Sequence, residues 1–371
     1  MIMDVSVFLY FSIIALTLFL MQVIPLRNHR ERKSLLGNIK MVLSIFLISY
    51  PLIVLLGSRI NIGTDYANYE RLYDYYLDTG ITTFEPFFYS LFWLGDKYQW
   101  NFDTFIIITS ILCVIVPLGF IKIKFSKEDL FVATFTLLVL LFGAWFNIIR
   151  QSIAMGVLLI SIHYLIKGKV IPYVLIVLIA SLCHISSLLF LPILLVIRTI
   201  QKSETPHKLI RNLFFLVLAC FVLIYSFLKF GANLAYFDHV GGKEDDGITS
   251  KWFIIFSLFL YLPEFFNIKN ILKYNKMYSV LYMLVALEFC CYLFGLYMNL
   301  GYRIGQLFSL VHVFLLPTTI KCTKISNKTI TKLYVVSVLL TFFYFTTFVA
   351  KYNGMYSYKY STSVFYELVP F

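Results

Sequence analysis

Long apolar runs, separated by short polar segments, dominate the pattern of the chain. Most runs are long enough to cross a bilayer as helices. We predict about ten to twelve spans, because the 170–197 region forms either two tight spans or one span with a re-entrant hairpin. The predicted fold class is an all-α, polytopic integral membrane protein with a single transmembrane domain over residues 1–371. The runs are 5–25, 41–57, 103–121, 129–146, 150–166, 170–183, 185–197, 212–230, 252–268, 277–297, 303–320 and 333–350.

Composition excludes several other classes of protein. With 60% hydrophobic and 13% charged residues, the chain does not resemble a soluble globular domain. Basic cytoplasmic loops explain the net charge of +12 better than nucleic-acid binding does, so no nucleic-acid partner is expected. The six cysteines show neither C-x-x-C nor Cys/His ligand spacing, so we expect no disulfide, metal or other cofactor.

The distribution of basic residues orients the predicted spans. If the basic loop 27–40 is cytoplasmic and the spans alternate, about two thirds of the 31 lysines and arginines lie inside, and most acids lie outside. Both termini then face outward. The outer face carries an outer loop with an interfacial helix at 57–102, a second outer loop at 231–251 and an outer C-terminal tail at 351–371. The protein is expected to act at this outer surface.

The first outer loop contains "SRINIGTDYANYERLYDYY", residues 58–76. From Asp65 onward the tyrosines recur at helical spacing, which predicts a helix with one aromatic face. Tyr66 and Tyr69 on this face are candidates for glycan contacts, because aromatic rings cover the apolar faces of sugars. The alternative is an aromatic anchor at the membrane surface. Asp65 is either a candidate catalytic carboxylate or the N-cap of this helix.

Two further residues are candidates for acid–base chemistry at the outer boundary. Glu85 precedes Pro86, so it either favours the start of a helix or accepts a proton from a sugar hydroxyl. His184 lies in a short polar break, "SLCHISS", between apolar runs. It is either a hydrogen-bonded structural residue or a general base.

Two arginines begin apolar runs at the predicted outer boundary. Arg150 lies in "FNIIRQSIAMG" and Arg303 lies in "GYRIGQLF". Each side chain either snorkels to the membrane surface or binds a diphosphate, helped by the positive end of its own helix. The neighbouring Gln151, Tyr302 and Gln306 are candidates for glycan contacts.

Ionisable residues are rare within the predicted spans. Glu288 lies deep in "LVALEFCCYL", and Glu264 lies near a helix end. An intramembrane carboxylate is a functional candidate, although it can instead pair with a buried arginine or stay protonated. His312 has no partner that the sequence identifies.

The ordered set of motifs resembles the EpsG family. Arg59 with "GTDYANY" is followed by "FEPFFYSLFWL", "IRQSIAMGVLL", "HISSLLFLP", "YRIGQLF" and a tyrosine-rich tail, and the resemblance covers roughly residues 40–365. These are membrane proteins of exopolysaccharide and O-antigen clusters, grouped with Wzy-type polymerases. The resemblance implies a multi-pass glycosyltransferase of the bacterial plasma membrane that joins undecaprenyl-diphosphate-linked oligosaccharides without nucleotide sugars. Implied partners are these substrates, membrane lipid and a chain-length regulator protein.

This chemistry gives roles to the candidate residues. Arg150 and Arg303, with Arg59, would stabilise the departing diphosphate. One of the three base candidates, Asp65, Glu85 or His184, would take the proton of the acceptor hydroxyl. Both an inverting and a retaining route remain open.

Three other functions compete with polymerisation. They are a lipid-linked oligosaccharide transporter, a membrane O-acyltransferase acting on surface glycans, and a non-catalytic assembly partner. A transporter would need charged residues through the membrane centre on several helices. An acyltransferase would need a histidine paired with a carboxylate, and His184 is the candidate.

Overall fold

The computed structural model describes residues 5–25, 34–194, 211, 248–296 and 300–349, and its elements are helices. Among these residues, six helices are long and apolar enough to cross a membrane, or eight if each of two bent pairs is one span. Two shorter apolar helices are α8 (Val170–Cys183) and α14 (Tyr278–Phe294). The prediction of an all-α polytopic membrane protein is confirmed. The predicted span 212–230, most of the loop 231–251 and the tail 351–371 lie outside the described residues.

The chain divides into two compact units. The first consists of Met1–Ser161, Leu175–Leu188 and Thr347–Phe371, and the second of Ile162–Val174 and Leu189–Thr346. A single transmembrane domain over residues 1–371 stays a prediction. In the first unit lie α1 (Val5–Val23), α2 (Leu35–Gly57), α3 (Tyr66–Thr79), α4 (Pro86–Lys97), α5 (Phe102–Lys124), α6 (Lys127–Asn147) and most of α7 (Ile149–Ile166). In the second lie α12 (Ile248–Phe266), α13 (Ile268–Tyr274), α14, α15 (Leu300–Ser309), α16 (His312–Cys322), η3 (Ile325–Asn327) and α17 (Lys328–Tyr344).

Polar side chains fix where the long helices of the first unit begin. Ser34 accepts a hydrogen bond from the backbone nitrogen of Gly37 at 3.0 Å, at the start of α2. The side-chain oxygen of Asn101 accepts a hydrogen bond from the backbone nitrogen of Thr104 at 2.8 Å, at the start of α5. Each cap satisfies a backbone donor that a helix start leaves open, which matters near lipid because water is scarce there.

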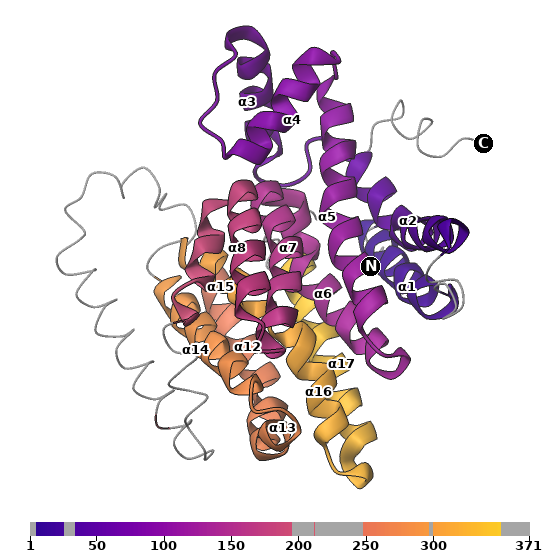
Figure 1. Cartoon of the computed structure of the whole chain (residues 1–371), viewed down its shortest axis with the longest axis vertical. Coiled ribbons are helices and arrows are strands. Elements are labelled where there is room, and N and C mark those ends of the chain that lie inside the picture. Colours follow the sequence, from indigo (N-terminus) through magenta and orange to yellow (C-terminus); the bar gives the residue numbers. More distant parts are fainter. Residues whose placement is uncertain (1–4, 26–33, 195–210, 212–247, 297–299, 350–371) are drawn as a thin grey trace, which may run out of the picture. The chain divides into compact units, whose positions relative to one another are not determined.

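Helices α3 and α4 lie beside each other next to one end of α5 (Figure 1). The tyrosine face predicted for α3 forms, and its side chains are buried. Tyr73 stacks on Phe105 of α5 at 5.1 Å and meets Phe92 of α4 edge-on at 5.2 Å, measured between ring centroids. Its hydroxyl donates to the carbonyl of Trp100 at 3.0 Å. The aromatic face therefore holds α3 against α4 and α5.

The loop before α3 is fastened to the junction of α6 and α7. The side-chain hydroxyl of Thr64 donates to the side-chain oxygen of Asn147 at 2.9 Å, and the backbone nitrogen of Thr64 bonds to the same oxygen. Gly63 has a positive φ of 102°, and a Cβ added to it would lie 2.3 Å from the backbone oxygen of Phe146. Only glycine fits this approach without displacing backbone.

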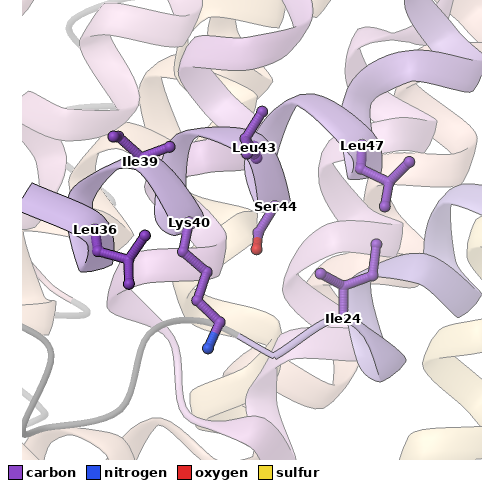
Figure 2. A pocket seen from close by; sticks show the side chains of 7 residues that line it. All are labelled: Ile24, Leu36, Ile39, Lys40, Leu43, Ser44 and Leu47. Carbon is purple, nitrogen blue, oxygen red and sulfur yellow. The ribbon is translucent and has the colours of Figure 1, made fainter.

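A groove of about 410 Å³ lies between the end of α1 and one face of α2 (Figure 2). The groove lies along the first turns of α2, at the end of that helix opposite to the loop that leads to α3. Its lining is mainly apolar, with one lysine, which suits a lipid chain and its headgroup better than a glycan. The residues that line it are Ile24, Leu36, Ile39, Lys40, Leu43, Ser44 and Leu47.

Gly63→Ala should destabilise the protein far more than Gly80→Ala. Both glycines have positive φ, so each substitution carries a backbone strain of about 1 kcal/mol. A Cβ at Gly80 meets nothing within 4 Å, whereas at Gly63 it also displaces the loop from Phe146. Thermal melting of the purified variants in detergent measures the difference. Equal shifts would mean that this close approach contributes nothing to stability.

Candidate functional site

The carboxylate of Glu85 is bonded by side chains from two other parts of the first unit. Nη1 of Arg150 lies 2.6 Å from Oε2, and Nδ1 of His184 lies 2.7 Å from Oε1. The backbone nitrogen of Ile185 donates to Oε1 at 3.3 Å. Three of the residues selected from the sequence therefore form one cluster, which we call the Glu85 site.

Helix ends place all three residues of the Glu85 site. Glu85 occupies the N-cap position of α4, and Pro86 fixes the first helical turn. Arg150 is the second residue of α7, after the break at Ile148. His184 follows the last residue of α8 and precedes the 3-10 helix η2 (Ile185–Phe190). Polar side chains at helix ends leave the apolar faces of the spans unbroken.

The Glu85 site is partly open to its surroundings. The side chains of Glu85, His184 and Arg150 are 13%, 22% and 26% exposed. This exposure leaves room for a ligand to contact the histidine and the arginine. The site thus meets the first requirement of a binding or catalytic centre.

Electrostatics keep Glu85 ionised. Burial of the carboxylate opposes its charged form and by itself would raise the pKa of Glu85. The hydrogen bond from His184 and the positive charge and hydrogen bond of Arg150 outweigh this effect, so the pKa of Glu85 is lowered to about 2. An ionised carboxylate accepts hydrogen bonds, so Nδ1 of His184 carries the proton that it donates. In a neutral imidazole Nε2 is then a proton acceptor, and no described residue bonds to it.

Aromatic side chains surround Arg150. Its guanidinium carbon lies 4.1 Å from the centre of the Phe84 ring, a cation–π contact. The hydroxyl of Tyr69 hydrogen-bonds to Arg150, and burial raises the pKa of this tyrosine, so the hydroxyl stays protonated. Tyr69, proposed from the sequence as a glycan contact, is buried beside Phe84, with ring centroids 6.2 Å apart.

The other residues selected in the first unit do not hydrogen-bond to Glu85. Arg59 is buried, with Nη1 donating to the carbonyl of Leu56 at 3.0 Å. Asp65 occupies the N-cap position of α3, but its side chain makes no capping hydrogen bond. Tyr66 is buried edge-on against Phe102 at 5.2 Å. Their functional roles stay predictions.

The remaining candidates are Gln151 and a group on α15. Gln151 follows Arg150 and is buried. On α15, in the second unit, Tyr302 and Gln306 are buried, and Nε of Arg303 donates to the hydroxyl of Tyr302 at 3.1 Å. The contribution of these residues to a diphosphate or glycan site also stays a prediction.

Sequence analysis missed Asn147 and Phe84. Asn147 ends the apolar run of α6, where an amide is a natural anchor for a neighbouring loop. Phe84 lies next to Glu85 in a motif that was already selected, but its contact with Arg150 requires the fold. Among the described residues, no three His, Cys, Asp or Glu side chains are arranged to hold a metal ion.

Glu85→Gln should flatten the acid side of the stability profile. Since the folded-state pKa of Glu85 is lowered to about 2, ionised Glu85 stabilises the fold above about pH 5. This contribution, about 3 kcal/mol at most, is lost as the pH falls toward about 2. Thermal melting between about pH 7 and pH 3 measures the difference between variant and wild type. The exposed Asp78→Asn variant is the control, and an identical profile for Glu85→Gln would contradict the assignment.

Comparison with known proteins identifies the family of the chain. No curated protein and no solved structure matches the chain. The model of the EpsG family matches residues 42–361, which is most of the chain and includes every residue of the Glu85 site. The chain therefore belongs to the EpsG family of multi-pass membrane proteins, which is linked to exopolysaccharide synthesis.

Proposed function

We propose that this protein is a polysaccharide polymerase on the outer face of the bacterial plasma membrane. It would join undecaprenyl-diphosphate-linked oligosaccharide repeat units, without a nucleotide sugar, into an O-antigen or exopolysaccharide. The observation that carries the proposal is the Glu85 site, in which a carboxylate, an arginine and a histidine meet in a partly open position. Membership of the EpsG family supports the substrate class.

His184 is the proposed general base. The acceptor hydroxyl of one repeat unit attacks the anomeric carbon of the growing chain, and its proton passes to Nε2 of His184. Glu85 positions the ring through Nδ1 and stabilises the imidazolium that forms. Glu85 itself is a weak base, because its pKa is about 2. Of the three base candidates, His184 is therefore the one that the geometry favours.

Arg150 is the proposed contact of the leaving group. As the new glycosidic bond forms, the bond between the anomeric carbon and the diphosphate oxygen breaks, and undecaprenyl diphosphate leaves as an anion. A guanidinium has five N–H donors, and Glu85 takes one of those of Arg150 at 2.6 Å. The remaining donors and the positive end of α7 favour the departing diphosphate. Arg303 and Arg59 remain proposed supporting cations.

Exposed aromatic residues offer surfaces for the glycan. Tyr66 and Tyr69 are buried, whereas Tyr75 of α3 is 50% exposed, and Tyr89 and Trp93 of α4 are 46% and 45% exposed. Such rings can cover sugar faces or sit at headgroup depth. The α3–α4 segment would then guide the chain toward the Glu85 site.

The pairing of His184 with Glu85 also favours a second candidate function, O-acyl transfer to a surface glycan. In that reaction the same base would take the proton of a glycan hydroxyl, while the leaving group would be that of an acyl donor. An arginine beside the base has a direct role with a diphosphate donor and no specific role with an acyl donor. Polymerisation is therefore the better match.

His184→Gln should abolish polymerisation while the protein still folds. A glutamine amide can donate to Glu85 but cannot accept a proton at neutral pH, so we expect a rate loss of about 100-fold or more. The chain is expressed in a strain that lacks its own surface-polysaccharide polymerase, and glycan length is resolved on a gel. His163→Gln is the control, because His163 is a histidine of α7 that does not bond to Glu85.

The outcomes separate the assignments. A ladder from wild type and the control, with a single repeat unit from His184→Gln and from Arg150→Ala at equal protein level, supports polymerisation through the Glu85 site. A normal ladder from His184→Gln contradicts the base assignment. If wild type gives no ladder but adds acyl groups to the glycan, the second function replaces the first.

A further inference from the structure

A second cluster of ionisable side chains lies inside the second unit. Nδ1 of His312 is 2.7 Å from Oε1 of Glu264, and Nε2 is 2.8 Å from Oε2 of Glu288. The side chains of His312 and Glu264 are 0% exposed, and that of Glu288 is 2% exposed. The three residues come from α16, α12 and α14. This His312 cluster contributes nothing to the mechanism proposed above, and the inference below does not depend on that mechanism.

Glu288 lies near the middle of α14, whereas Glu264 is near the end of α12 and His312 begins α16. Counted over each bent pair as one span, Glu264 and His312 also lie well inside their spans. Glu288 is ten residues beyond Tyr278, the first residue of α14, and His312 is ten residues before Cys322, the last residue of α16. Ten residues of helix rise about 15 Å, which is half of a hydrocarbon core about 30 Å thick. Ionisable side chains at this depth are costly, so they are normally kept for a function.

Both bent spans of the second unit carry a residue of the cluster. Helices α12 and α13 are bent by 62° after Phe266, close to Glu264. Helices α15 and α16 are bent by 45°, and His312 is the first residue after that break. Broken helices near the bilayer centre are where membrane proteins place ion-binding groups, because the breaks supply polar groups inside the apolar core.

Counting protons shows that the cluster is one positive charge short. If both carboxylates are ionised and His312 is protonated, each ring nitrogen donates to one carboxylate and the net charge is −1. A neutral ring with one protonated carboxylate holds the same number of protons. No other positively charged side chain among the described residues bonds to Glu264 or Glu288. One further proton makes the cluster neutral.

The two carboxylates differ in the hydrogen bonding of the oxygen that does not face His312. Glu288 also hydrogen-bonds to the hydroxyl of Tyr292. Oε2 of Glu264 is buried and has no hydrogen-bond partner among the described atoms. An ionised oxygen without a partner is costly in an apolar interior, whereas a protonated one costs much less. Glu264 is thus the place for the additional proton.

The other groups that face the cluster carry no charge at neutral pH. Tyr261 of α12 stacks on the His312 ring, with centroids 5.6 Å apart. Tyr282 of α14 donates to the backbone oxygen of Glu264 at 2.8 Å. Other neighbours that interact with these groups are Ser257, Phe265, Phe289, Cys291, Tyr292, Ser309 and Cys322. Proton uptake by the cluster itself is therefore the means of balancing its charge.

We propose that Glu264, His312 and Glu288 form an intramembrane proton-binding site, in which Glu264 holds the additional proton on Oε2. The bound proton removes the net charge and allows the two bent spans to pack against α14. Loss of this proton as the pH rises leaves a net negative charge in the core and loosens that packing.

Infrared spectroscopy tests the proposal, because the carbonyl stretch of a protonated carboxylic acid is separate from that of a carboxylate. Detergent-purified wild type, with and without ¹³C-labelled glutamate, should show one glutamic acid band at neutral pH. The band should be lost in Glu264→Gln and retained in Glu128→Gln, a change of an exposed acid at the start of α6. Absence of the band in wild type overturns the proton site, and its persistence in Glu264→Gln overturns the assignment to Glu264.

Thermal melting against pH supplies a second measurement. Wild type should lose stability as the pH rises and the glutamic acid band disappears, both with the same midpoint. Glu264→Gln imitates the protonated acid, so it should keep its stability at neutral pH and lose this part of the pH dependence. A band that disappears with no change in melting would overturn the link between the proton and the packing of the bent spans.

Discussion

The ionised carboxylate of Glu85 is the constraint on which the candidate site depends. A carboxylate at the edge of a membrane bundle must be compensated, because few water molecules solvate it there. Here Arg150 and His184 compensate it at 2.6 Å and 2.7 Å, one on each oxygen. The same bonds fix the start of α4, the start of α7 and the end of α8 relative to each other within the first unit. The chemistry of the site and the packing of three helices thus share one set of contacts.

A polar anchor and aromatic packing hold the rest of the α3–α4 segment in place. The loop at Gly63 and Thr64 is fastened to Asn147, three residues before Arg150. The aromatic face of α3 is used to pack on α4 and α5. In a soluble enzyme a hydrophobic core would position such a segment. Here the rings of α3 and α4, together with Phe102 and Phe105 of α5, form an aromatic core of their own.

The sequence predicted the elements and most of the individual residues of the site, but not how they pair. Helical spacing, Pro86 and the polar break at His184 identified the helix ends correctly, since these signals are local. Glu85 is 65 residues from Arg150 and 99 from His184, and no local pattern reports a contact over such a separation. The tyrosine pattern of α3 predicted a face without saying what the face would meet. The face packs inside the protein, and periodicity alone cannot distinguish such packing from a glycan surface or a membrane anchor.

The two ionisable clusters solve the same problem of charge in different ways. At the Glu85 site a guanidinium supplies the positive charge, and a guanidinium stays protonated at any physiological pH. The Glu85–Arg150 pair is therefore neutral at physiological pH, which suits the base role proposed for His184. In the His312 cluster no bonded lysine or arginine is present among the described residues, so only protons can balance the two carboxylates. A fixed counter-charge suits a site that must orient a base continuously. A titratable counter-charge suits a site whose net charge changes when a proton binds. In the proposed site, the packing of the two bent spans changes with that charge.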